Sequence, residues 1–211
     1  MSVEESAPKG PAHSARLAYQ QTIEQRRTAV RAQLTRILVG SSTFTWELGC
    51  GHGHFLAAYA QANPDKLCIG IDIVSERIQR ALRKRDRAQL ANLFFVHAEA
   101  RLFLDVLPPD ASFSDLFILF PDPWPKVRHH KHRILQRDFL ARAATNATEL
   151  SRICFRTDHS VYFENARRAI HSSPHWQLAE GQWPFEFCTV FQSRAVHYQS
   201  LIARRAPLRL P

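Results

Sequence analysis

From residue 43 onwards, short runs rich in β-branched and aromatic residues alternate with longer stretches whose apolar residues recur at helical spacing. The short runs predict strands near 43–48, 67–73, 93–97, 114–120 and 151–157. The longer stretches predict helices over roughly 54–62, 75–88, 100–106, 136–149 and 160–172. This alternation is typical of an α/β fold with a mainly parallel sheet and helices on both faces. The segments "WQLAEGQWPFEF" and "VHYQSLIAR" predict a final antiparallel pair of strands, which would make the sheet seven-stranded.

The region before residue 43 has a different pattern. Residues 1–12 contain prolines and no apolar run, which predicts a flexible tail. Residues 13–40 carry Ile23, Val30, Leu34 and Leu38 at near-helical spacing, so we expect a helical extension that lies against the main body. Residues 41–211 are then expected to form one domain, a usual size for a single hydrophobic core.

Charge narrows the range of partners. Twenty-eight Lys and Arg against nineteen Asp and Glu give a net charge of +9, which indicates a polyanionic partner, either nucleic acid or an anionic membrane surface. Simple solubility is the alternative explanation. We expect a cytoplasmic protein, because the chain shows no secretory leader and no apolar stretch long enough to span a membrane. The four cysteines include no CxxC pair, so no metal site is expected.

A glycine-rich loop, "WELGCGHGHFL", follows the first predicted strand. Gly49, Gly51 and Gly53 allow backbone conformations closed to other residues and let N–H groups approach a ligand at the start of a helix. The spacing departs from the G-x-G-x-x-G pattern of dinucleotide sites. Glu47, just before the loop, would repel a pyrophosphate and attract a cation.

Two more carboxylates follow the next strands in order. Asp72 ends the second strand, nineteen residues after Gly53, where an acidic side chain can accept hydrogen bonds from ribose hydroxyls. Glu99 follows the third strand. Three carboxylates around a glycine loop suit a ligand with a ribose, an adenine amino group and a positive charge. S-adenosylmethionine has all three, so it is the cofactor that we expect here.

The segment "FPDPWPKVRHHKHRI" follows the fourth strand. Asp122 lies between Pro121 and Pro123, which restrict the backbone on either side of its carboxylate. Trp124 could stack on an unpaired base or pack beneath the loop. A cationic and imidazole set follows, which is expected to contact phosphates: Lys126, Arg128, His129, His130, Lys131, His132 and Arg133.

A further basic set recurs at helical intervals in the stretch after Asp72. Its members, Arg80, Lys84 and Arg87, could form a solvated helix face or contact RNA.

With "ELGCGHG", "GIDI", "HAEA", "FPDPWPKVRHHKHRI" and "RTDHSVYFENA", the chain resembles the tRNA (guanine-N7)-methyltransferase family of the bacterial single-subunit type, from about residue 43 to 192. The resemblance implies a class I Rossmann-like fold and S-adenosylmethionine as cofactor. It also implies methylation of N7 of the guanosine at position 46, in the variable loop of tRNA. The tRNA would be the partner, and the chain a monomer or a homodimer.

The resemblance also implies roles for individual residues. Asp122 would be the catalytic residue. The cofactor would be bound by Glu47, Gly49, Gly51, Gly53, Asp72, Glu99 and Asp122. The substrate would be bound by Lys126, Arg128, Asp158, Thr189, Phe191 and Gln192. At the last site the family usually has Thr-Lys-Phe-Glu, whereas this chain has Thr189-Val190-Phe191-Gln192 and lacks the family's usual glycine-containing end.

Two other functions stay open on the sequence. One is an exocyclic-amino methyltransferase acting on adenine or cytosine, although those enzymes usually have consecutive prolines before the aromatic residue rather than the separated "PDPW". The other is an RNA-binding module with a degenerate methyltransferase site, suggested by Gln192 and the altered chain end. Asp158, finally, could contact the guanine edge or cap the following helix.

Overall fold

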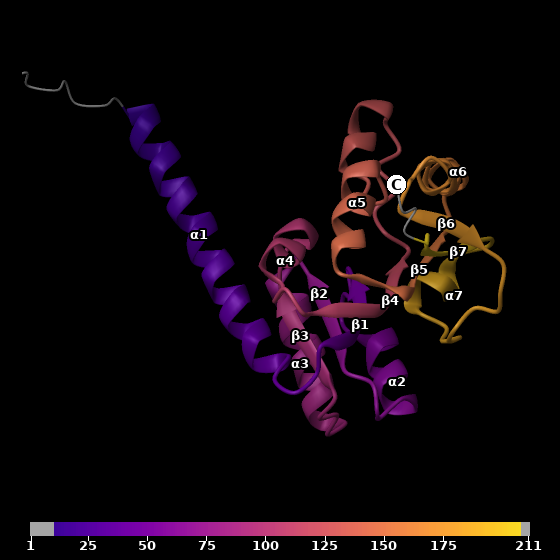
Figure 1. The fold of residues 1–211 in the computed structure, drawn as a ribbon, viewed down its shortest axis with the longest axis horizontal. Coiled ribbons are helices and arrows are strands. Elements are labelled where there is room, and N and C mark those ends of the chain that lie inside the picture. Colours follow the sequence, from indigo (N-terminus) through magenta and orange to yellow (C-terminus); the bar gives the residue numbers. More distant parts are fainter. Residues whose placement is uncertain (1–10, 208–211) are drawn as a thin grey trace, which may run out of the picture.

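The computed structural model describes residues 11–207, which form a seven-stranded sheet with helices on both faces (Figure 1). The sheet order is β3-β2-β1-β4-β5-β7-β6. The strands are β1 (Thr43–Leu48), β2 (Cys68–Asp72), β3 (Leu93–His97), β4 (Ser112–Leu119), β5 (Ala147–Thr157), β6 (Trp176–Ala179) and β7 (Gln199–Arg205). The helices are α1 (Pro11–Ile37), α2 (His54–Ala62), α3 (Ser75–Arg87), α4 (Ala100–Val106), η1 (Val127–His132), α5 (Arg137–Thr145), α6 (Ser160–His171) and α7 (Val190–Arg194).

The strand order fixes where a ligand can bind. Strands β1 to β5 are parallel, and β7 runs antiparallel to both β5 and β6. Strand β1 lies between β2 and β4, so the chain reverses its direction of winding at the β1–β4 boundary. In open α/β sheets, ligands bind beyond the carboxyl ends of the strands at such a switch point. Leu48 pairs with Ile118 there, so the loops that follow β1 and β4 start side by side.

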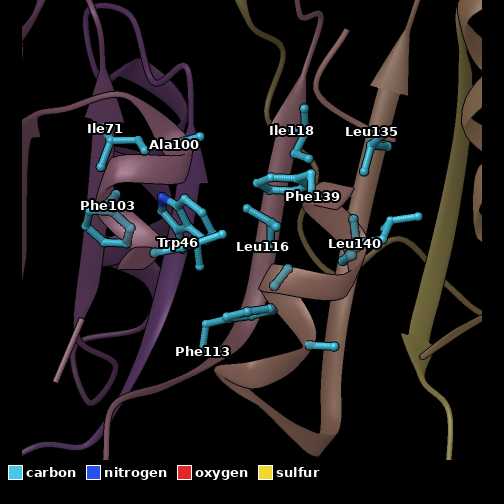
Figure 2. Close-up of a cluster of buried hydrophobic side chains, with 14 of the residues drawn as sticks. Trp46, Ile71, Ala100, Phe103, Phe113, Leu116, Ile118, Leu135, Phe139 and Leu140 are labelled. Atoms are coloured by element: carbon cyan, nitrogen blue, oxygen red, sulfur yellow. The ribbon is translucent and has the colours of Figure 1, made fainter. Parts of the chain in front are cut away.

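The hydrophobic core lies on both faces of the sheet. On one face Trp46 stacks on Phe103 of α4 with ring centroids 4.9 Å apart, and Phe113 and Phe139 complete an aromatic layer (Figure 2). Buried residues of α1, α4, α5 and α6 belong to this cluster. On the other face α2 and α3 pack against the sheet, and the ring centroids of Phe55 and Phe117 lie 4.8 Å apart. These buried alternating side chains hold the strand ends in a fixed relation to one another.

The first helix packs along only part of its length. Val30 and Leu34 are buried against the main body, whereas Leu17 is 45% and Tyr19 67% exposed. In Figure 1 the amino-terminal part of α1 extends away from the sheet. The helix begins at Pro11, inside the stretch predicted as a tail; residues 1–10 lie outside the described residues.

Most predicted elements are confirmed, and the differences are local. Helix α5 ends at Thr145, four residues before the predicted end, because Asn146 bonds to the Ala111 carbonyl and the chain enters β5 directly. Of the predicted strand in "WQLAEGQWPFEF", only Trp176–Ala179 pairs with β7. The periodic pattern did not predict η1 or α7, which are short helices within loops.

Candidate functional site: an acid-floored crevice at the β1–β4 switch point

The three glycines of the loop after β1 serve two different purposes. All three have positive φ, at 73° for Gly49, 54° for Gly51 and 69° for Gly53. A Cβ at Gly53 would collide with the ring of Phe95, so this glycine permits α2 to approach the sheet. A Cβ at Gly49 or Gly51 would meet no atom of the described residues within 4 Å. The loop therefore leaves open space beside its first two glycines, where a ligand can approach the backbone.

Glu47 supplies a buried carboxylate beneath this loop. Its side chain lies in β1 and is only 4% exposed, and Oε2 has no hydrogen-bond partner among residues 11–207. Burial, together with the neighbouring Asp72 carboxylate, raises the pKa of Glu47 to about 8, although a backbone hydrogen bond from Leu56 opposes the shift. A buried polar atom without a partner is costly, so the site suits a ligand that brings a cation.

Asp72 joins the carboxyl end of β2 to the glycine loop. Its Oδ2 accepts a hydrogen bond from the Gly51 N–H at 3.0 Å, and its Oδ1 accepts one from the Val74 N–H at 2.8 Å. Arg77 lies 3.7 Å from Oδ2. The carboxylate therefore holds the loop in place. Each of its oxygens keeps a further lone pair for a ligand hydroxyl.

Glu99 is the N-cap of α4. Its Oε2 accepts hydrogen bonds from the backbone N–H groups of Arg101 and Leu102, at 2.9 and 3.0 Å. This explains locally why a carboxylate follows β3. Because β3 lies beside β2, Glu99 ends on the same edge of the sheet as Asp72.

The loop after β4 holds Asp122 in a constrained backbone. Phe120 and Trp124, on either side of the Pro-Asp-Pro segment, have φ of 48° and 44°, values that side-chain-bearing residues rarely adopt. Asp122 is exposed and accepts no hydrogen bond from the described residues. Strain of this kind persists only where surrounding contacts impose it, and it gathers at functional sites.

Arg133 provides those contacts. Its side chain is buried; Nε donates to the Pro123 carbonyl at 2.8 Å, and Nη2 lies 3.5 Å from the Trp124 carbonyl. Its guanidinium stacks over the ring of Tyr162, 4.9 Å from the centroid. The prediction that Arg133 contacts phosphates is therefore wrong, because the side chain is buried and its Nε and Nη2 bind the loop from inside.

The other members of this basic set lie nearer the surface. Lys126, Arg128 and Lys131 are exposed on and beside η1. Trp124 is 37% exposed and packs against His132, with centroids 4.9 Å apart. It neither lies beneath the loop nor stands free of it.

A second buried arginine organises the chain after β6, and sequence reasoning missed it. Arg156, near the end of β5, donates to both oxygens of Glu186, at 2.8 and 3.0 Å. It also donates to Gln192 Oε1 at 3.1 Å. Its guanidinium lies between the rings of Trp183 and Tyr198, 4.2 and 4.8 Å from their centroids. Four aromatic and polar residues within sixteen positions were the available signal, since a buried cation needs such partners.

The predicted substrate residues have distinct surroundings. Thr189 is the N-cap of α7, where its hydroxyl accepts a hydrogen bond from the Gln192 N–H at 3.0 Å. Phe191 is 62% exposed. Asp158 is exposed after β5, and His159, rather than Asp158, caps α6 through Nδ1.

The sheet thus brings most predicted site residues to one edge. Glu47 and Asp72 lie at the carboxyl ends of parallel strands, and the glycine loop, Glu99, Asp122 and Asp158 follow such ends. Gln192 joins them through Arg156. Within residues 11–207 no cluster of three His, Cys, Asp or Glu could hold a metal ion. No described helix is long and apolar enough to cross a membrane.

The seven-stranded order and this loop arrangement define a class I, Rossmann-like methyltransferase fold. Among solved structures, the chain is similar to a 16S rRNA (adenine(1408)-N(1))-methyltransferase variant from Catenulisporales acidiphilia, with a TM-score of 0.56 and 16% identity. That match covers 86% of this chain and 93% of the other. TrmN from Thermus thermophilus matches with a TM-score of 0.58 and 15% identity over 83% of this chain and 48% of the other.

Sequence comparison then defines the family. A family model described as "putative methyltransferase" matches residues 41–199, and the chain belongs to this family. Curated relatives named tRNA (guanine-N(7)-)-methyltransferase include one from Mycobacterium leprae, 29% identical over 85% of this chain and 80% of the relative. Another, from Treponema pallidum, is 35% identical over 72% of this chain and 63% of the relative. A third, from Thermus thermophilus, is 35% identical, but the match spans only 57% of this chain and 39% of that relative.

Proposed function

We propose that this protein transfers a methyl group from S-adenosylmethionine to N7 of guanosine 46 in the variable loop of tRNA. The proposal rests chiefly on two carboxylates that lie at the ends of the adjacent strands β1 and β4. One, Glu47, is buried without a partner for Oε2 among the described residues; the other, Asp122, is exposed in a constrained loop. The names of the curated relatives support the same activity.

The residues of the crevice fit S-adenosylmethionine, which supplies a sulfonium-bound methyl group when it is bound. Glu47 offers a carboxylate oxygen to a cationic group of the ligand. The open space beside Gly49 and Gly51 admits a ligand against the backbone. Asp72 accepts from the ribose hydroxyls, and Glu99 lies on the adjacent strand end for the adenine.

The reaction requires little acid–base catalysis by the protein. Guanine N7 already carries an in-plane lone pair, so no base must remove a proton before attack. Catalysis then consists mainly of aligning N7, the methyl group and the sulfur, and such alignment can lower the activation barrier by roughly 7–11 kcal/mol at the favourable limit. Asp122, held by Arg133 through the Pro123 carbonyl, stabilises the positive charge that develops on the purine ring.

Cations at the mouth of the crevice bind the RNA. Lys126 and Arg128 lie exposed just after the Asp122 loop and contact tRNA phosphates. Asp158, Thr189, Phe191 and Gln192 lie on the substrate side and contact the guanosine or its neighbours. In this proposal the chain departs from the family at Gln192 without losing the activity, because Glu186 supplies a carboxylate to Arg156.

The test is to map the modified nucleotide. Purified protein is incubated with an unmodified tRNA transcript and S-adenosylmethionine, and the nuclease-digested RNA is analysed by mass spectrometry. We expect one 7-methylguanosine at position 46 and none in a transcript with adenosine there. Methylation of an exocyclic amino group would support an amino-methyltransferase instead. Tight tRNA binding with no methyl transfer would indicate a binding module.

A further inference from the structure

A basic hollow lies beside the crevice, between the start of α2 and the outer face of α3. It has a volume of about 430 Å³ and is lined by His52, His54, Arg80, Arg83, Lys84 and Arg87. Every one of these side chains is a cation or an imidazole. The candidate cofactor residues do not line it, although His52 and His54 flank Gly53 of the glycine loop. The hollow is therefore a neighbour of the cofactor crevice with a different chemistry.

The arrangement of α3 explains how the hollow forms. Ile78 and Ala81 are buried and attach the helix to the sheet. Arg80, Arg83 and Arg87 are exposed, and three- or four-residue spacing places them along one face. At 1.5 Å per residue, this row extends over about 10 Å of helix. One charged ligand atom would use only part of such a row, whereas a chain of phosphates uses all of it.

The charges in this row lack carboxylate partners. On the same helix Arg77 lies 3.7 Å from Asp72, and Arg85 pairs with Asp86 at 2.6 Å. Among the ion pairs of residues 11–207, none involves Arg80, Arg83 or Arg87. Lys84 has no such partner either, so four cations line one hollow without a carboxylate partner in the described part of the chain.

Burial first and the neighbouring cations second act on His54 and Lys84. Lys84 Nζ lies 2.7 Å from His54 Nδ1. Partial burial and then the Lys84 charge lower the pKa of His54, while burial and Arg87 lower the pKa of Lys84. An anion in the hollow would relieve this repulsion.

We propose that the hollow binds the phosphate backbone of the tRNA substrate, on the α2–α3 flank of the crevice. This inference rests on the proposed function and names a second RNA contact, separate from Lys126 and Arg128 after β4. RNA that contacts both sets spans the crevice from the β2 side to the β4 side, with the reacting guanosine between them. Neutralising phosphates with arginines releases counterions, so the contact carries a salt dependence.

The test compares two double variants of equal charge change. Arg80→Gln/Arg83→Gln removes two cations from the hollow, whereas Arg167→Gln/Arg168→Gln removes two exposed cations from α6 at the far end of the sheet (Figure 1). Binding of an unmodified tRNA transcript is measured by fluorescence anisotropy at several salt concentrations. We expect the hollow variant to bind roughly tenfold more weakly and its log K–log salt slope to fall by about 1.4–1.8, the value for two lost phosphate contacts. The α6 variant keeps the wild-type slope.

Two results would overturn the inference. An unchanged slope in the hollow variant means that these arginines do not contact phosphates. Equal loss in both variants means that only overall charge matters. Binding of S-adenosylhomocysteine to each variant serves as the check that the crevice is folded. If the wild type methylates guanosine 46 and the hollow variant binds tRNA as tightly as the wild type, only this inference fails. If the wild type neither binds nor methylates tRNA, the proposed function fails as well.

A separate arm distinguishes RNA from a small anion. Inorganic phosphate is added to the wild type and to the hollow variant, and the melting temperature is recorded. Little difference between the two is expected, because a single phosphate uses only part of the row. Stabilisation of the wild type alone, combined with an unchanged tRNA slope, would identify a small-anion site and contradict the proposal.

Discussion

The two sides of the crevice are held by opposite kinds of interaction. On the β1–β2 side the loop is fixed by backbone groups and small residues: Gly51 donates to Asp72, and Gly53 lets α2 approach Phe95. On the β4–β5 side two buried arginines, Arg133 and Arg156, bind carbonyls and carboxylates from inside. The first side presents buried carboxyl groups to a ligand, and the second uses buried positive charge to shape its own loops.

Residues of one basic segment can therefore have opposite surroundings. Arg133 and Lys126 belong to the same cationic stretch, yet one is buried and one is exposed. Arg133 is buried and two of its nitrogens bind loop carbonyls, so it organises the Asp122 loop and does not contact RNA. Substitutions on the two sides should therefore have separable effects on cofactor binding and on turnover.

The largest effect is expected at Asp122. Asp122→Ala should lower kcat by about 100-fold or more, because the charge beside the purine is lost. Melting temperature and affinity for S-adenosylhomocysteine are measured in parallel, and the exposed side chain predicts no loss of stability. Asp122→Asn separates two roles, since it keeps a hydrogen-bond acceptor and removes the charge. Near-normal turnover in the alanine variant would remove Asp122 from the catalytic role.

Arg133→Met should sharpen the comparison. The change removes the hydrogen bonds that the guanidinium donates to the Pro123 and Trp124 carbonyls, and a hydrogen bond to a charged group contributes about 1.5–3 kcal/mol. We expect kcat to fall roughly tenfold, by the loss of a constraint of that size. Affinity for S-adenosylhomocysteine should stay unchanged. Arg137→Gln, an exposed arginine on α5, is the matched control. If Arg133→Met weakened S-adenosylhomocysteine binding as much as it lowered kcat, the two sides of the crevice would not be independent.

A smaller effect is expected around Arg156. Gln192 accepts from Arg156 and donates to the Tyr198 hydroxyl at 3.1 Å. Gln192→Glu keeps the first contact and reverses the second, because a carboxylate can only accept from the Tyr198 hydroxyl. Glu186→Gln removes the ion pair that orders residues 183–198 and should raise KM for tRNA about threefold, in line with a partly exposed pair. The double variant Glu186→Gln/Gln192→Glu returns a carboxylate to Arg156 and should recover part of that loss in KM. A double variant no better than Glu186→Gln would exclude this exchange of charge.

The smallest effect is a pH dependence of stability on the cofactor side. The pKa of Glu47 is about 8 in the folded protein against an ordinary 4.5, so the fold favours its protonated form. That contribution to the free energy of unfolding is complete below pH 4.5 and is lost as pH rises through 8. Glu47→Gln should therefore gain stability over the wild type as pH rises from about 4.5 to about 8, and each kcal/mol gained should raise the melting temperature by roughly 2–4 °C. Parallel melting curves at all pH values would contradict the assignment.

The sequence predicted the local structure of the β1–β2 side of the crevice better than that of the β4–β5 side, for physical reasons. Strand β1 and helices α2 and α4 have their predicted bounds, because regular apolar spacing determines them. The positions of the glycine loop, Glu47, Asp72 and Glu99 follow from strand order, because the carboxyl ends of parallel strands meet at one edge of the sheet. The β4–β5 side depends on hydrogen bonds between distant residues, such as Arg156 with Glu186 and Ile134 with Tyr162. Local periodicity carries no information about such pairs, so the burial of Arg133 and the short helix α7 were not predicted.

Calorimetric titration with S-adenosylhomocysteine and S-adenosylmethionine tests most directly whether the acid-floored crevice holds this cofactor. We expect the wild type to bind both ligands and Glu47→Gln to bind them at least roughly tenfold more weakly, since a charged hydrogen bond of about 1.5–3 kcal/mol is lost. Wild-type affinity should rise from pH 6 to pH 8 as Glu47 ionises. No heat of association with either ligand, or equal affinity in the wild type and Glu47→Gln, would contradict it.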